Sequence, residues 1–147
     1  MNIWTNGCFD VLHRGHFELF KHAKSLGSKL IVGIDSDRRV KESKGSDRPI
    51  STAEDRKFAL QSIKYIDDVV VFDSDEELKS ALVVHKIDTM VIGSDWRGKT
   101  VVGQELVEQL HFFDRIGSYS TTNILVTTGT NKTYVFDIDG TICTNTY

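Results

Sequence analysis

Several features are scarce in this chain of 147 residues, and each scarcity excludes a class of protein. Only two cysteines occur, Cys8 and Cys143, so the sequence offers no disulfide framework and favours a reducing, cytoplasmic compartment. No stretch approaches the roughly 18 apolar residues of a membrane span, and no signal-peptide pattern is visible. The 18 basic and 21 acidic residues give a net charge of -3, which disfavours a dedicated nucleic-acid binder. We therefore expect neither a membrane nor a nucleic acid as partner.

The chain alternates between two kinds of segment. Short, nearly continuous apolar runs are typical of strands covered on both faces, and the segments between them carry apolar residues at helical spacing. Right-handed β-α-β crossovers then predict an α/β fold with a doubly wound parallel sheet of about five strands. We expect strands at residues 1–5, 29–34, 69–72, 89–92 and 111–116. We expect helices at residues 13–27, 51–63 and 75–85, and one starting near 103.

Local signals predict the boundaries of these segments. Ser51 and Glu54 fit a capping box at the start of a helix. The polar stretch before it contains Gly45 and the only proline, and predicts a long loop over residues 35–49. A later stretch rich in Thr, Gly and Asn predicts a linker. The expected organisation is one domain at 1–126, the linker at 127–132 and the start of a second unit at 133–147.

A candidate site follows the first strand, where Gly7-Cys8-Phe9-Asp10 leads into His13-Arg14-Gly15-His16. Open parallel sheets bind ligands beyond the carboxyl ends of their strands. His13 and His16 are three residues apart, so they lie on one face of the helix start. Free N–H groups and the helix dipole attract an anion there, and Gly15 leaves space beside the backbone. These features predict a phosphate-binding turn.

Two other interpretations of the histidines are open at this stage. A histidine near a helix start is often only a cap or a surface residue. A zinc site would need a third ligand, and Cys8 is the candidate that the nearby sequence offers. Two histidines that flank a glycine directly after a strand and turn favour phosphate over both interpretations.

Three further stretches follow strands and are expected at the same edge of the sheet. Lys44 lies in the long loop, Trp96 follows the fourth strand, and Arg115 follows the fifth. Each has a plainer explanation, since a charged loop is usually solvated, a Trp can be a lid residue, and hydroxyl residues such as Ser120 often only cap a helix.

In this order, the residues resemble those of the cytidylyltransferase-like nucleotidyltransferases. The opening element is residues 7–16, and the closing element is Arg115 followed by Ser120-Thr121-Thr122, so the resemblance covers about residues 1–125. It implies a Rossmann-like fold, CTP or ATP as donor, and a phosphorylated alcohol or sugar as acceptor. It also implies Mg²⁺ bound mainly through the nucleotide phosphates, and a homodimer.

The resemblance implies a role for each matched residue. The catalytic set, which contacts the triphosphate and stabilises the growing charge, comprises His13, His16, Lys44 and Arg115. The nucleotide-binding set comprises Gly7, Cys8, Phe9, Asp10, Gly15, Gly93, Asp95, Trp96, Ser120 and Thr121. Lys64 and Asp35 are expected to bind the acceptor. Asp10 is expected to orient the His13–His16 turn or a metal-bound water, and a carboxylate is expected to fix the histidine tautomer.

Two branches of the family compete. Residues 64–67, 93–99 and the spacing within 115–122 resemble glycerol-3-phosphate cytidylyltransferases, whereas residues 44–49 and 119–124 resemble adenylyltransferases that act on heptose 1-phosphate. We expect CTP and glycerol 3-phosphate, because the Trp96 loop lies near where the family binds its base. Lys64 stands where those cytidylyltransferases usually carry Arg, and Lys lacks the planar fork that grips a phosphate.

A hypothesis of another class is a catalytically silent nucleotide-binding module. Cys8 gives it weak support, because a Thr is common at this position in the glycerol-phosphate enzymes. The intact set of His13, His16, Lys44, Arg115 and Thr121 speaks against it.

The C-terminal stretch has a resemblance of its own. Residues 136–141 (FDIDGT) resemble the opening motif of haloacid-dehalogenase-type phosphatases, in which the first Asp is the nucleophile. Only six residues follow Thr141. We therefore expect Asp137 and Asp139 to be inactive here, and the chain to be an N-terminal piece of a longer two-enzyme protein or a truncated relic of one.

Overall fold

The computed structural model describes residues 1–114. The expectations for Arg115, Ser120 and Thr121 lie outside the described residues, as do the linker at 127–132 and the unit at 133–147. No helix in the described part is both long and apolar enough to cross a membrane.

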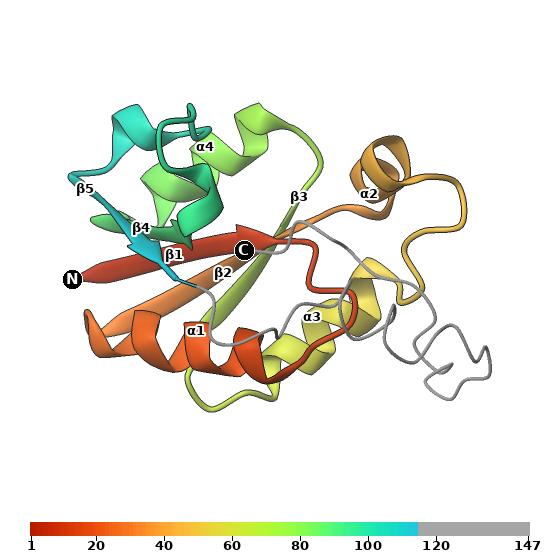
Figure 1. The fold of residues 1–147 in the computed structure, drawn as a ribbon, viewed down its shortest axis with the longest axis horizontal. Helices are drawn as coiled ribbons and strands as arrows, with labels where there is room; N and C mark the ends of the chain where they lie inside the picture. Colours follow the sequence, from red (N-terminus) through yellow and green to blue (C-terminus); the bar gives the residue numbers. More distant parts are fainter. Residues whose placement is uncertain (115–147) are drawn as a thin grey trace.

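A five-stranded parallel sheet forms the centre of the fold (Figure 1). Its strands lie in the order β3-β2-β1-β4-β5, so the chain winds outward from β1 in both directions. The β1 register against β2 is continuous, with Asn2 opposite Lys29 and Gly7 opposite Ile34. This confirms the predicted α/β class and the doubly wound, Rossmann-like sheet. The strands are β1 (Asn2–Gly7), β2 (Lys29–Asp35), β3 (Asp68–Phe72), β4 (Thr89–Gly93) and β5 (Gln109–Phe113).

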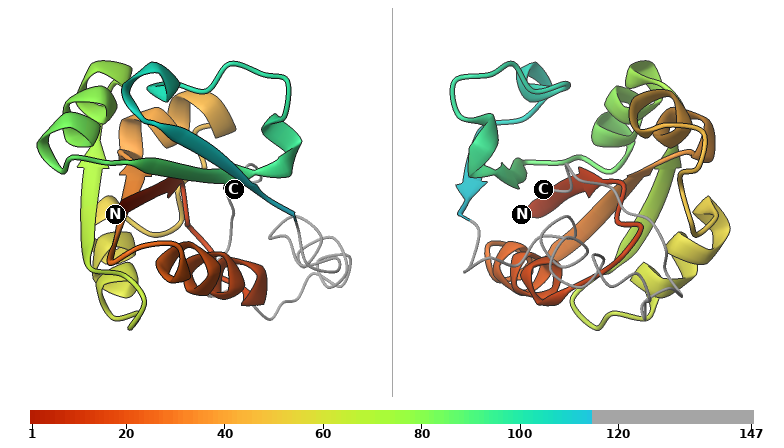
Figure 2. Two further views of the ribbon diagram at one scale, coloured as in Figure 1. Left: turned by 90° about the vertical axis from the view of Figure 1, so that its left-hand side faces the viewer. Right: turned by 45° about the vertical axis from the view of Figure 1, so that its right-hand side comes forward.

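Helices cover both faces of the sheet (Figure 2). α1 and α3 lie on one face, while α4 lies on the other together with the segment that carries two short 3-10 helices. The elements are α1 (Arg14–Ser25), α2 (Asp37–Lys44), α3 (Ala53–Gln61), α4 (Asp75–Val84), η1 (Ser94–Trp96) and η2 (Gln104–Leu106). α2 stands beyond the carboxyl end of β2.

Each face of the sheet has its own apolar core. Leu19 and Phe20 of α1 pack with Val32 on one face, and Trp4 packs with Phe72 and Leu82 on the other. Gly33 of β2 allows this second core to close, because a Cβ there would lie 2.3 Å from Cζ2 of Trp4. The two cores hold the carboxyl ends of β1 and β2 rigidly side by side.

The structure corrects the prediction of a long loop over residues 35–49, since α2 lies within it. Ser36 caps this helix by accepting a hydrogen bond from the Arg39 N–H at 3.3 Å. Val40 is its one buried residue. A helix with a single buried residue shows no apolar periodicity, which is why the pattern was missed.

Three other boundaries differ from prediction. The N-cap of α3 is Thr52, whose hydroxyl accepts from the Asp55 N–H at 3.2 Å, and not Ser51. The helix expected near 103 is only the three-residue η2. The fifth strand runs over Gln109–Phe113, two residues earlier than its predicted start at 111.

Candidate functional site

The two histidines of the turn after β1 cap α1 reciprocally. His13 is the N-cap residue, and its Nδ1 accepts from the Gly15 N–H at 3.0 Å. The His13 N–H donates in turn to Nδ1 of His16 at 3.1 Å. This is a capping box built from imidazoles in place of the usual hydroxyl and carboxylate. Both side chains are buried, at 7% and 0% exposure.

This cap determines which ring nitrogen carries the proton. A neutral imidazole has one N–H and one acceptor nitrogen, and in both rings Nδ1 is the acceptor. The neutral rings therefore carry their proton on Nε2, which makes Nε2–H a hydrogen-bond donor in each. The expected carboxylate partner is replaced by two backbone amides.

The surroundings of His16 keep it neutral. Burial lowers the pKa of His16 well below its ordinary value of 6.5, and the neighbouring His13 lowers it further. The two ring centroids lie 3.9 Å apart. Phe9 contacts His16 edge-on with a centroid distance of 5.4 Å. His16 is thus held as a neutral imidazole, and its Nε2 is buried in this structure.

Phe9 and Asp10 have positions that differ from the expected ones. The Phe9 side chain is 1% exposed and packs against Phe20 and His16, so its ring supports the turn from within the core. The Asp10 carboxylate accepts from the N–H groups of Ile50 at 2.8 Å and Ser51 at 2.9 Å. Both of its oxygens therefore hold the chain before α3, and the expected role of Asp10 in orienting the turn or a metal-bound water stays a prediction.

Burial also affects the charge of Asp10. Desolvation raises the pKa of Asp10 above its ordinary 3.8, although the two backbone hydrogen bonds and the nearby Arg56 and Arg48 charges oppose that shift. The charged form of this carboxyl is thus stabilised by its hydrogen bonds and by the nearby Arg charges, and not by contact with water.

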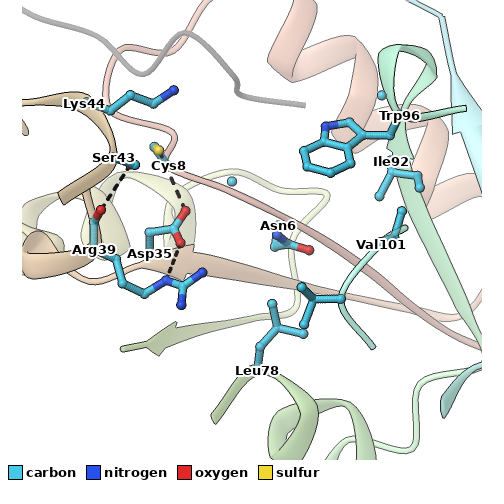
Figure 3. A pocket seen from close by; sticks show the side chains of 13 residues that line it. Asn6, Cys8, Asp35, Arg39, Ser43, Lys44, Leu78, Ile92, Trp96 and Val101 are labelled. Atoms are coloured by element: carbon cyan, nitrogen blue, oxygen red, sulfur yellow. Dashed lines mark hydrogen bonds and ion pairs between the residues drawn. The ribbon is translucent and has the colours of Figure 1, made fainter. Parts of the chain in front are cut away.

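A cavity of about 240 Å³ opens at the carboxyl ends of β1, β2 and β4 (Figure 3). One wall is polar and comes from the end of β2 and from α2, with Asp35, Arg39, Ser43 and Lys44. The opposite wall is mostly apolar and comes from α4, β4 and the segment after it, with Leu78, Ile92, Trp96 and Val101. Asn6 lies between the walls, and Gly7, Cys8 and Gly93 complete the lining.

Arg39 is the main residue of this wall that sequence reasoning missed. Its Nε donates to Oδ1 of Asp35 at 2.9 Å, and its Nη1 lies 3.2 Å from Oδ1 of Asp75. The guanidinium also stacks over the Phe72 ring at 5.1 Å. Oδ2 of Asp35 lies 3.7 Å from Sγ of Cys8. Asp35 ends β2 whereas Arg39 lies within α2, so helical spacing does not predict this ion pair.

The cavity gathers many of the predicted site residues. Gly7, Cys8, Asp35, Lys44, Gly93 and Trp96 line it. The turn that carries Asp10, His13, Gly15 and His16 follows directly from the lining residue Cys8. Trp96 is 39% exposed, and Lys99 Nζ lies 5.6 Å from the centre of its ring. Asp95 is exposed and does not line the cavity.

Lys64 is not brought to the site. It lies between α3 and β3, in a connection that enters a strand, so it stands at the amino edge of the sheet. The site lies at the carboxyl edge. Lys64 Nζ lies 5.2 Å from the ring centre of Tyr65. Lys64 therefore does not line the carboxyl-edge cavity of this chain, and its role in acceptor binding stays a prediction.

The chemistry available at this edge is that of an anion site. Two imidazoles stand at a helix N-terminus, burial keeps that of His16 neutral, and the cation Lys44 faces the cavity. Among residues 1–114, no group of three His, Cys, Asp or Glu side chains is arranged to hold a metal ion. The arrangement suits the binding of phosphates and the stabilisation of charge on them.

Comparisons with known proteins agree with this geometry. The family model described as "Cytidylyltransferase-like" matches residues 4–134. The chain is 44% identical over 123 residues to the bifunctional protein HldE of Campylobacter fetus subsp. fetus (strain 82-40), covering 84% of this chain and 27% of that protein. It is 43% identical over 123 residues to the bifunctional protein HldE of Helicobacter pylori (strain ATCC 700392 / 26695), covering 84% and 26%.

The chain thus spans about a quarter of the length of these curated relatives. Among solved structures, the lipopolysaccharide core biosynthesis protein from Thermoplasma volcanium GSS1 matches with a TM-score of 0.66. That match covers 80% of this chain and 98% of that one at 20% identity, so it concerns the fold alone.

Proposed function

Because this chain belongs to the cytidylyltransferase-like family, we propose that it transfers a nucleotidyl group from ATP to a sugar 1-phosphate of the heptose 1-phosphate type. The products are an ADP-sugar and pyrophosphate. The observation that carries the transfer chemistry is the imidazole capping box at the start of α1, in which both Nδ1 atoms are acceptors, so that each neutral ring holds its proton on Nε2. Donors fixed in advance of the reaction stabilise developing charge without reorganising.

The choice of ATP and a sugar phosphate corrects the expectation of CTP and glycerol 3-phosphate. The HldE relatives favour the heptose 1-phosphate adenylyltransferase branch, which residues 44–49 and 119–124 also resemble. The structure gives one residue of the other branch's resemblance a structural role. In the segment 64–67, Asp67 accepts from Lys24 Nζ at 2.6 Å and from the Leu30 N–H at 2.8 Å, so it ties α1 to β2.

The two walls of the cavity support a sugar as the acceptor. A pyranose or furanose ring has apolar C–H faces and a rim of hydroxyl groups. Trp96, Ile92 and Val101 provide an apolar surface for such a face, and Asn6, Asp35 and Ser43 provide polar atoms for the rim. Lys44 stands at the same cavity with a positive charge for the acceptor phosphate. Glycerol 3-phosphate has no ring face to place against the indole.

The proposed step needs no general base. An oxygen of the acceptor phosphate is already an anion, and it forms a new bond to the α-phosphorus of ATP. The bond from that phosphorus to the bridging β-phosphate oxygen breaks, and pyrophosphate leaves with the electron pair. Catalysis is then positioning and charge stabilisation. We assign charge stabilisation to His13, His16 and Lys44, and by resemblance to Arg115.

We propose that Mg²⁺ accompanies the nucleotide. Hard oxygen ligands from phosphates and water suit this ion, and when bound it neutralises charge on the triphosphate.

Pyrophosphate release tests the proposal. The protein is incubated with ATP or CTP, each combined with heptose 1-phosphate, another sugar 1-phosphate or glycerol 3-phosphate. We expect release with ATP and a sugar 1-phosphate, and little with CTP or glycerol 3-phosphate. Pyrophosphate release with CTP but not with ATP would instead assign the protein to the cytidylyltransferase branch. Nucleotide binding without release in every combination would favour the silent nucleotide-binding module.

A further inference from the structure

Arg56 is a buried cation whose side chain does not itself line the cavity. Its side chain is 1% exposed, at the fourth residue of α3. The guanidinium donates to four acceptors at 2.8–3.0 Å: the carbonyl oxygens of Cys8, Asp35 and Ser51, and Oδ1 of Asp37. A buried charge is tolerated only when it is paired and hydrogen-bonded. The sequence position of Arg56 gives no hint of this environment.

These acceptors belong to the segments that build the site. Cys8 and Asp35 are the cavity-lining residues at the ends of β1 and β2. Asp37 begins α2, the helix that carries Arg39 and Lys44 to the cavity. One guanidinium therefore joins the turn before the histidines to α2, the helix of the polar wall.

Asp10 contributes to the same connection, because it binds Ser51 as Arg56 does. The Ser51 N–H donates to Oδ1 of Asp10, while the Ser51 carbonyl accepts from Nε of Arg56. Ser51 is thus held through both of its backbone polar groups. We call Asp10, Ser51, Arg56 and the Cys8 carbonyl the Ser51 latch. It ties the turn that leads to His13 to the chain that leaves α2.

We propose that Arg56 is a positioning residue for nucleotidyl transfer, which through the Ser51 latch sets the imidazole donors and Lys44 at a fixed separation across the substrates. The proposal rests on the function proposed above. Transfer between two bound phosphates depends on their alignment, and small misplacement has a large effect on rate. Binding of ATP alone depends less on that alignment, so the effect falls on kcat more than on KM.

Arg56→Lys tests this with the charge retained. Lysine offers one nitrogen with three donors in place of the five of a planar fork, so it cannot reach all four acceptors. We expect kcat to fall by about 10- to 100-fold, with KM for ATP changed by less than about threefold. The matched control is Arg38→Lys on α2, where an exposed Arg pairs with Asp73 and Glu42 away from the cavity. Its kcat should equal that of the wild type.

Asp10→Asn opens the latch from the other side, because its amide N–H₂ cannot accept from a backbone N–H. If both residues act through one latch, the double variant should lose no more kcat than the worse single variant. Additive losses would contradict a shared latch, and a wild-type kcat in Arg56→Lys would overturn the proposal. Should Arg56→Lys fail to fold, Asp10→Asn decides alone: unchanged kcat there also overturns it.

A readout that is independent of turnover separates this proposal from the proposed function. Amide hydrogen exchange should show Ile50 and Ser51 losing protection in Arg56→Lys and in Asp10→Asn, but not in Arg38→Lys. If the wild type releases no pyrophosphate while protection changes as expected, the proposed function fails and the latch stands. Unchanged protection of both amides in both variants would show that Asp10 and Arg56 do not act together as a latch.

Discussion

The two nitrogens of His16 perform separate tasks. Nδ1 accepts from the His13 N–H and so completes the cap of α1, while Nε2 carries the proton that we assign to phosphate stabilisation. A substitution therefore affects stability through one atom and turnover through the other. This separation allows the two tasks to be measured apart.

His16→Gln and His16→Ala should differ in stability but not in turnover. Gln at this helix position is an ordinary partner in a capping box, whereas Ala leaves the His13 N–H without its acceptor at a cost of about 1 kcal/mol. Both lack the ring donor, so kcat should fall by about 10²–10³. Urea unfolding and single-turnover kinetics measure the two effects. Wild-type kcat in His16→Gln would remove His16 from the mechanism.

The neutral state of His16 predicts how stability depends on pH. The pKa of His16 lies well below 6.5 in the folded protein. Below pH 6.5, His16 therefore binds a proton in the unfolded chain but stays neutral in the folded protein. The free energy of unfolding should therefore fall as the pH drops below 6.5, by at most about 1.4 kcal/mol per pH unit for this group. Burial, His22 and Arg97 lower the pKa of His111 as well, which adds a term of the same sign.

Urea unfolding of wild type and His16→Gln between about pH 7.5 and about pH 5.5 isolates the His16 contribution. The variant should retain the His111 contribution and show a shallower slope. Equal slopes in the two proteins would show that His16 is not the source.

At the scale of elements, two neighbouring residues at the start of α3 have different roles. Thr52 supplies the capping hydroxyl, whereas the contacts of Ser51 described above are made by its backbone. Thr52→Ala should lower the free energy of unfolding by about 1 kcal/mol, and Ser51→Ala by less than about 0.5 kcal/mol. Thermal or urea unfolding gives both values. A larger loss in Ser51→Ala than in Thr52→Ala would show that Ser51 is the N-cap residue, as the sequence predicted.

The elements that were predicted correctly are those with a strong apolar signal. Residues 29–34 form a continuous apolar run, and β2 is buried along nearly all of its length. α2 gave no such signal because it buries only Val40. Its polar residues are required at the cavity wall and in contacts with Asp35 and Asp73, so the helix that contributes most to the site is the least visible in the sequence.

At the scale of the whole molecule, sheet topology decides which predicted site residues meet. Segments that follow strands lie at the carboxyl edge, and Cys8, Asp35 and Trp96 are found there. Segments that precede strands lie at the other edge, which is why Lys64 does not line the cavity. This distinction was available from the predicted order of strands and helices. The contacts of Arg56 were not, because they depend on how three segments distant in sequence pack around one side chain.

The proposed transfer is tested most directly by following the acceptor's oxygen atoms. Sugar 1-phosphate labelled with ¹⁸O in its phosphate is incubated with unlabelled ATP and this protein, and the products are analysed by mass spectrometry. All of the label should appear in the ADP-sugar and none in the pyrophosphate, because the acceptor oxygen attacks the α-phosphorus. Label in the pyrophosphate, or release of free ADP or AMP in place of an ADP-sugar, would contradict nucleotidyl transfer at this site.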